Sequence, residues 1–242
     1  MALTKIAARD AAAQELEERE GGAPSAARGV RRRWLSAAVG LAIAMALAWS
    51  GRHRLLAVAG HVLVSEDAIA AADAIVVSMG GENAAAVEAG QLYEQRIAPL
   101  ILLPVWNEDG VEDELRKLGF PRYAPPGILP SILERSGVPD SAIQNLPGIV
   151  DGTDTEVAAI AAFARQRQLA SVLFLTSRPH TARARWLLTR QLPPGTRLYV
   201  RSPRTDKFSP DAWWRSRNES REVALEYLRW FNILVLRDQW SR

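Results

Sequence analysis

Hydrophobic residues follow two alternating patterns along most of this chain. Short, nearly continuous apolar runs, typical of strands buried on both faces of a parallel sheet, are separated by segments of helical periodicity. The runs predict strands at 72–78, 99–103, 143–150, 171–175 and 197–201, and the periodic segments predict helices at 84–96, 111–118, 128–136, 153–168, 182–192 and 219–236. This alternation predicts an α/β domain with a doubly wound, mostly parallel sheet over residues 57–242.

A different pattern precedes this domain: residues 34–50 contain no charge and are mostly apolar. As a helix this segment would span roughly 25 Å, close to the lower limit for crossing a bilayer. Trp34 and Trp49 stand near its ends, and five arginines lie within residues 19–33 before it, while two follow closely. This asymmetry predicts a transmembrane signal anchor, with residues 1–33 as a mobile cytoplasmic tail and the domain on the extracytoplasmic side of the plasma membrane. Cleavage after Ala48 is the alternative, and it would also export the domain.

Charge is unevenly distributed, although the net charge is only +3. Residues 55–177 carry seven basic and sixteen acidic side chains, whereas residues 178–221 carry eleven basic and three acidic ones. The net charges of these two parts of the domain nearly cancel, so we expect no nucleic-acid partner. The polarity has two interpretations: the two parts attract each other or form solvated faces, or the basic part binds an anionic ligand. The chain has no cysteine, which excludes disulfides and thiolate chemistry.

The most informative segment follows the strand 171–175. Thr176 and Ser177 end that strand, and His180 and Arg183 stand three positions apart at the start of a helix. In an open α/β sheet a ligand binds at the carboxyl ends of the strands, against helix N-termini. His180 is therefore the predicted catalytic residue, and Arg183 the predicted anion ligand, both acting in binding rather than in stability. The predicted ligand-binding residues are Ser78, Gly80, Gly81, Thr155, Thr176, Ser177 and Arg183.

Other polar residues have a structural interpretation. Thr153 and Glu156 match the spacing of a capping box at the start of a helix. Asp73 is interpreted as a residue at the edge of the first strand, and the charges of Arg178 and Arg185 as solvated. No cluster with metal-ligand spacing stands out, so no metal is predicted.

Four places in the chain resemble the bacterial YdcF/SanA/ElyC-like family of Rossmann-like domains, which are often membrane-anchored. These are the entry to the first strand at 61–64 and 72–77, the segment 89–99, the threonine segment 153–156, and the motif Thr176-Ser177-x-x-His180-x-x-Arg183-Ala184, with a closing helix that contains Glu226. The resemblance covers roughly residues 57–236 and implies a three-layer sandwich with a role in the cell envelope. This chain departs from the family at Ala85, at Leu103-Pro104-Val105 and at Val157 or Ala158, where the family has Arg, Ser-Gly-Gly and Asn.

Three classes of function follow from these observations. The first is an exported, anchored domain that binds a phosphorylated or otherwise anionic small molecule or lipid-linked precursor of peptidoglycan or lipid-carrier metabolism, with hydrolysis or transfer of it as a further expectation. The second is a non-catalytic binding or scaffold protein, in line with the missing family ligands. The third is a nucleotide or S-adenosylmethionine binder, suggested by the Rossmann-like resemblance. The sequence assigns no cofactor.

Overall fold

The computed structural model describes residues 25–79, 81–106, 117–118 and 128–236. These residues fall into two compact units that divide after Arg54. Of the helix predicted at 111–118, only residues 117 and 118 are described, so that prediction lies almost entirely outside the described residues.

The first unit consists, where described, of the helix α2 (Ser25–Val62) up to residue 54. The apolar side chains that the structure describes here are exposed, including Trp34 at 73% and Trp49 at 69%. In the part of the chain that the structure describes, no single helix is long and apolar enough to cross a membrane. The consecutive segments Arg33–Ala46 and Trp49–Val62 meet the requirements of length and composition only as a bent pair. The anchor at 34–50 therefore stays a prediction.

The second unit contains a five-stranded sheet in which every pair of strands is parallel. Its strands are β1 (Ala74–Val77), β2 (Ile101–Leu103), β3 (Ile143–Asn145), β4 (Ser171–Leu175) and β5 (Arg197–Arg201), in the order β3-β2-β1-β4-β5. Strands β1, β2 and β4 are entirely buried, as their continuous apolar runs predict. The strand predicted at 143–150 is shorter than expected, because only 143–145 pair with β2 and Val150 forms an isolated bridge with Trp106.

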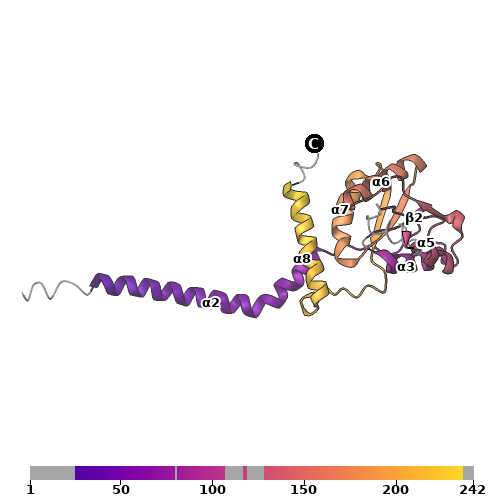
Figure 1. Ribbon diagram of the computed structural model, residues 1–242. Helices are drawn as coiled ribbons and strands as arrows, with labels where there is room; N and C mark the ends of the chain where they lie inside the picture. The colour runs from indigo at the N-terminus through magenta and orange to yellow at the C-terminus, as the bar shows by residue number, and fades with distance from the viewer. Residues whose placement is uncertain (1–24, 80, 107–116, 119–127, 237–242) are drawn as a thin grey trace, which may run out of the picture. The chain divides into compact units, whose positions relative to one another are not determined.

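Helices cover both faces of the sheet (Figure 1). On one face, α3 (Glu82–Glu94) and α5 (Leu129–Arg135) pack in a core with Ile75, Leu103 and Leu175. On the other face, α6 (Thr153–Arg167) and α7 (Thr181–Gln191) pack in a second core with Val76, Phe174 and Val200. The α/β fold and the parallel sheet predicted from the sequence are thus confirmed. The chain builds outward from β1 in one direction and from β4 in the other, so the topology switches between these two strands.

A third, smaller core holds the end of α2 against the C-terminal helix α8 (Arg217–Phe231). Leu63, Phe208 and Val223 are its buried members. Two hydrogen bonds support the contact: Trp213 in the short helix η3 (Trp213–Arg215) donates to the Leu56 carbonyl at 2.8 Å, and the Tyr227 hydroxyl donates to the Ala59 carbonyl at 2.8 Å. The predicted helix 219–236 begins earlier, at Arg217, and its last turn, η4 (Asn232–Leu236), is a π-helix.

Candidate functional site

The carboxyl ends of β1 and β4 meet at the switch point of the sheet. Val77 pairs with Leu175, and the Ser78 amide donates to the Leu175 carbonyl at 3.0 Å. The Thr176 hydroxyl donates to the Ser78 hydroxyl at 3.3 Å. The structure therefore brings together the ends of two strands that are almost a hundred residues apart in sequence. Both hydroxyl groups belong to fully buried residues, so they lie beneath the surface of this edge.

Gly81 packs closely on the end of β4. A Cβ atom at this position would lie 3.1 Å from the Leu175 carbonyl oxygen and 2.6 Å from the Cβ of Ala85. Only glycine allows this approach without a shift of the turn. Gly80, the other predicted glycine ligand, lies outside the described residues.

Glu156 completes the polar group beneath this edge. It lies in the first turn of α6, is only 1% exposed, and accepts hydrogen bonds from the Met79 amide at 2.9 Å and from the Ser78 hydroxyl at 3.4 Å. Burial raises the pKa of Glu156 to about 7, although the bonds from Met79 and Ser78 and the charge of Arg183 oppose the rise. A buried carboxyl group that changes its proton near neutral pH is a feature of many functional sites. We therefore add Glu156 to the candidate site.

The cap of α6 differs from the predicted capping box. Thr155, not Glu156, caps the helix: its hydroxyl oxygen accepts from the amides of Gly152 at 3.1 Å and Asp151 at 3.0 Å. The prediction that Thr153 and Glu156 form a capping box is therefore wrong, because Glu156 turns inward to β1. Thr155, predicted as a ligand-binding residue, is exposed at the carboxyl edge, and its hydroxyl donates to the Gly152 carbonyl at 2.9 Å.

His180 and Arg183 contact a partner that the sequence motif does not contain, Glu226 on α8. The Nε and Nη2 atoms of Arg183 donate to the two carboxylate oxygens at 2.8 and 3.1 Å. Nη2 also contacts Nδ1 of His180 at 2.7 Å. Because arginine has only donors, Nδ1 accepts this bond, and a neutral His180 carries its proton on Nε2. The 3.4 Å approach of Nδ1 to Glu226 is then a contact rather than a hydrogen bond.

Burial governs the protonation of this group, since His180 and Arg183 are about 95% buried and Glu226 is 98% buried. Burial lowers the pKa of His180, so the imidazole is neutral over a wider pH range. Burial alone would raise the pKa of Glu226, but the hydrogen bonds and the positive charge of Arg183 outweigh it and hold the pKa well below its usual range. The guanidinium fork of Arg183 is thus already occupied by a carboxylate. Its role as an anion ligand stays a prediction.

Ser177 is half-buried and precedes the short helix η2 (Arg178–His180). Next to it, the Arg178 amide donates to Asp206 at 2.7 Å, and its side chain donates to Glu66 at 3.0 Å. The interpretation of Arg178 and Arg185 as solvated charges is therefore wrong: Arg185 pairs with Asp67, and both arginines are partly buried.

Three ion pairs join the acidic and the basic parts of the domain. Glu66, Asp67 and Glu88 belong to the acidic part of the chain, and each pairs with an arginine of the basic part. Of the two interpretations, attraction between the two parts accounts for these charges. Asp73 also has a structural role, because it accepts the amides of Ala170 and Ser171 at 2.6 and 2.8 Å, where β4 begins.

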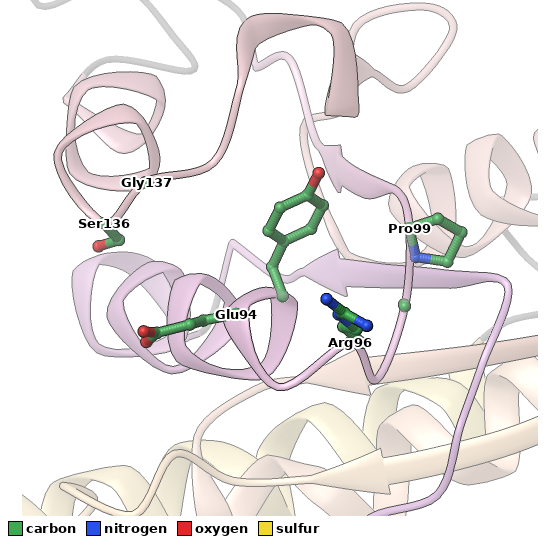
Figure 2. A pocket seen from close by; sticks show the side chains of 7 residues that line it. Glu94, Arg96, Pro99, Ser136 and Gly137 are labelled. Atoms are coloured by element: carbon green, nitrogen blue, oxygen red, sulfur yellow. The ribbon is translucent and has the colours of Figure 1, made fainter.

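A surface pocket of about 560 Å³ lies elsewhere, where α3 ends and β2 begins. Figure 2 shows Glu94 and Arg96 at the end of α3, Pro99 before β2, and Ser136 and Gly137 after α5. Because these residues precede β2 or follow the helices, the pocket belongs to the amino edge of the sheet. It contains none of the predicted site residues. The described residues also include no group of three or more side chains that could hold a metal ion.

No protein-family model matches this chain, and no curated protein matches it. The resemblance stated above therefore stays a prediction based on its motifs.

Proposed function

We propose that this protein binds a small anionic, phosphorylated ligand at the carboxyl edge of its sheet, between the ends of β1 and β4. The observation that carries the proposal is the cluster of Ser78, Glu156 and Thr176 beneath the switch point, the place where open α/β sheets bind ligands. Helices α3, α6 and α7 each follow a strand, so their N-termini, with partial positive charge, turn toward the same edge.

The chemistry of this edge favours hydrogen bonding over charge pairing. Arg178 and Arg183 are engaged by Glu66 and Glu226, so backbone amides and the exposed or half-buried Thr155 and Ser177 would hold the ligand. Below pH 7 Glu156 is mostly protonated and adds no negative charge to repel an anion. If the ligand is hydrolysed or transferred, Glu156 is better suited than the low-pKa His180 to exchange a proton near neutral pH.

The remaining parts of the proposal concern location. The uncharged segment 34–50 with its exposed apolar side chains supports a signal anchor that places the domain outside the cytoplasm. A role in cell-envelope metabolism, with a peptidoglycan or lipid-carrier precursor as ligand, rests on the family resemblance.

A non-catalytic binding protein is the second candidate. The observation that favours it is the complete burial of Ser78 and Thr176, together with the occupied fork of Arg183. No hydroxyl group of this pair is exposed for attack on a substrate.

Binding and turnover separate the two candidates. The full-length chain, purified in detergent, is titrated calorimetrically with pyrophosphate and S-adenosylmethionine, and phosphate release from pyrophosphate is followed in parallel. We expect pyrophosphate binding that Ser177→Ala weakens and that Ser141→Ala, an exposed serine before β3, leaves unchanged. Phosphate release identifies a hydrolase, and binding without release identifies a binding protein. If pyrophosphate does not bind, or both variants bind it alike, the proposed site is wrong, and binding of S-adenosylmethionine alone would favour the third class of function.

A further inference from the structure

The C-terminal helix α8 has an outward apolar stripe. Val223 and Glu226 are buried on its inner side, while Leu225, Leu228 and Phe231 are 40%, 61% and 54% exposed, and Val235 in the following turn is 57% exposed. Leu225, Leu228 and Phe231 follow one another at intervals of three residues, which places them on neighbouring positions of one helix face, and Val235 continues the apolar surface in η4. An exposed apolar stripe of this kind on a surface helix is typical of a site that contacts another protein or a membrane.

The orientation of this stripe is fixed from the inside. Glu226 accepts two bonds from Arg183, and Trp230 packs edge-on against Trp186 of α7 with ring centroids 5.7 Å apart. Both residues lie on the inner side of α8, so the helix cannot rotate its apolar side inward without breaking a buried ion pair. The stripe is therefore a stable feature of the folded unit.

A second stripe lies on the part of α2 that packs beside α8. Leu55, Val58 and Val62 are each at least 60% exposed and are spaced by three and four residues. The hydrogen bonds of Trp213 to Leu56 and of Tyr227 to Ala59 hold the two helices together, and Figure 1 shows α8 beside the end of α2. The end of α2 and α8 thus both present apolar side chains to the outside.

The chain itself indicates what covers this surface. Leu55 follows Ser50, the end of the uncharged segment, by five residues, or about 8 Å along a helix, which is comparable to the thickness of the bilayer interface. We propose that α8 and residues 55–62 of α2 lie on the lipid surface, with Leu228, Phe231 and Val235 inserted among the acyl chains. This inference rests on the proposed signal anchor. Because α8 carries three arginines and three glutamates, we expect the contact to be insensitive to lipid charge.

The absence of cysteine makes the test direct. Single variants Leu228→Cys and Phe231→Cys of the full-length chain are labelled with an environment-sensitive fluorophore and reconstituted into phosphatidylcholine vesicles that contain nitroxide-labelled lipid. Glu222→Cys is the matched control, because residue 222 is exposed on the same helix nine positions, or half a turn, from Phe231. Thermal unfolding of each labelled variant checks that the fold is retained.

We expect several-fold stronger quenching by the nitroxide lipid at positions 228 and 231 than at position 222, unchanged when phosphatidylglycerol is added. If the protein floats with the vesicles but all three labels are quenched equally weakly, the anchor holds and the α8 contact is wrong. A blue-shifted, unquenched label at 231 would show that protein rather than lipid covers this position and would also overturn the inference. If the protein does not float, both the anchor and the α8 contact are wrong.

Discussion

Replacing Arg183 by alanine tests whether the His180–Arg183 pair stabilises the fold or serves a ligand. The substitution removes both bonds to Glu226 and leaves its carboxylate 98% buried beside a neutral imidazole. Removal of one partner of a buried ion pair typically costs about 3 to 5 kcal/mol. The half-exposed Arg229 still contacts Glu226 and offsets part of this loss, so we expect a value near the lower limit. The sequence-based expectation of an unchanged melting temperature is thereby revised.

The measurement is urea unfolding of the full-length chain, followed by tryptophan emission. A loss of about 3 kcal/mol corresponds to a fall of roughly 6 to 12 °C in melting temperature for a domain of this size. Arg229→Ala is the matched control, because it removes an exposed partner of the same carboxylate, and we expect it to cost less than about 1 kcal/mol. The double variant Arg183→Met/Glu226→Leu should recover most of the loss, since an apolar pair leaves no buried charge without compensation.

The dependence on pH gives an independent check. The pKa of Glu226 in the folded protein is below its usual value of 4.5, so its stabilising contribution is present above that pH and disappears as the pH falls. The gap between wild type and Arg183→Ala should therefore narrow in acid. If Arg183→Ala abolishes pyrophosphate binding and leaves the unfolding midpoint unchanged, the argument for a structural role is refuted and Arg183 is a ligand.

Two further predictions concern Glu156 and the contact between α3 and α5. Because the pKa of Glu156 is about 7 in the folded protein and its usual value is 4.5, the folded state is more stable when this carboxyl group is protonated. This stabilisation is present below pH 4.5 and is lost as the pH rises through about 7. We therefore expect Glu156→Gln to increase the free energy of unfolding at pH 8 by up to roughly 3 kcal/mol and to have little effect at pH 4. Equal effects at both pH values in urea titrations would contradict this. A Cβ atom at Gly90 would lie 2.5 Å from the Cβ of Ser136. We therefore expect Gly90→Ala to lower the free energy of unfolding by about 1 to 3 kcal/mol, and a second substitution, Ser136→Gly, to restore most of that loss. Thermal melts in which the double variant is no more stable than Gly90→Ala would contradict the contact.

The sheet could be predicted because each of its central strands has a local sequence signal, a short apolar run. Each of the runs that form β1, β2 and β4 is apolar at nearly every position, and a strand buried on both faces has no other requirement. For the observed order β3-β2-β1-β4-β5, right-handed βαβ connections place α3 and α5 on one face of the sheet and α6 and α7 on the other. The strand predicted at 143–150 was too long, since only residues 143–145 pair with β2.

The site was harder to predict because its partners are distant in sequence. Glu226 lies more than forty residues after His180 and Arg183, and although the family resemblance includes it in the closing helix, no local pattern indicates that it contacts these two residues. Glu156 was concealed by a local signal, since a glutamate three residues after a threonine at a helix start has the spacing of a capping box. Which threonine caps the helix depends on its backbone, and here Thr155 takes that role.

The same long-range pairing changes what kind of anion recognition this domain can perform. From the sequence, the basic segment 178–221 favoured a site built on arginine, but Arg178, Arg183, Arg185 and Arg204 each pair with a carboxylate within the second unit. A ligand at the carboxyl edge would therefore compete for charges that already stabilise the fold, or use backbone amides at the helix N-termini. The second route leaves the ion pairs intact. It also means that selectivity would depend on the geometry of the 78–81 turn, which Glu156 holds through Met79 and Ser78.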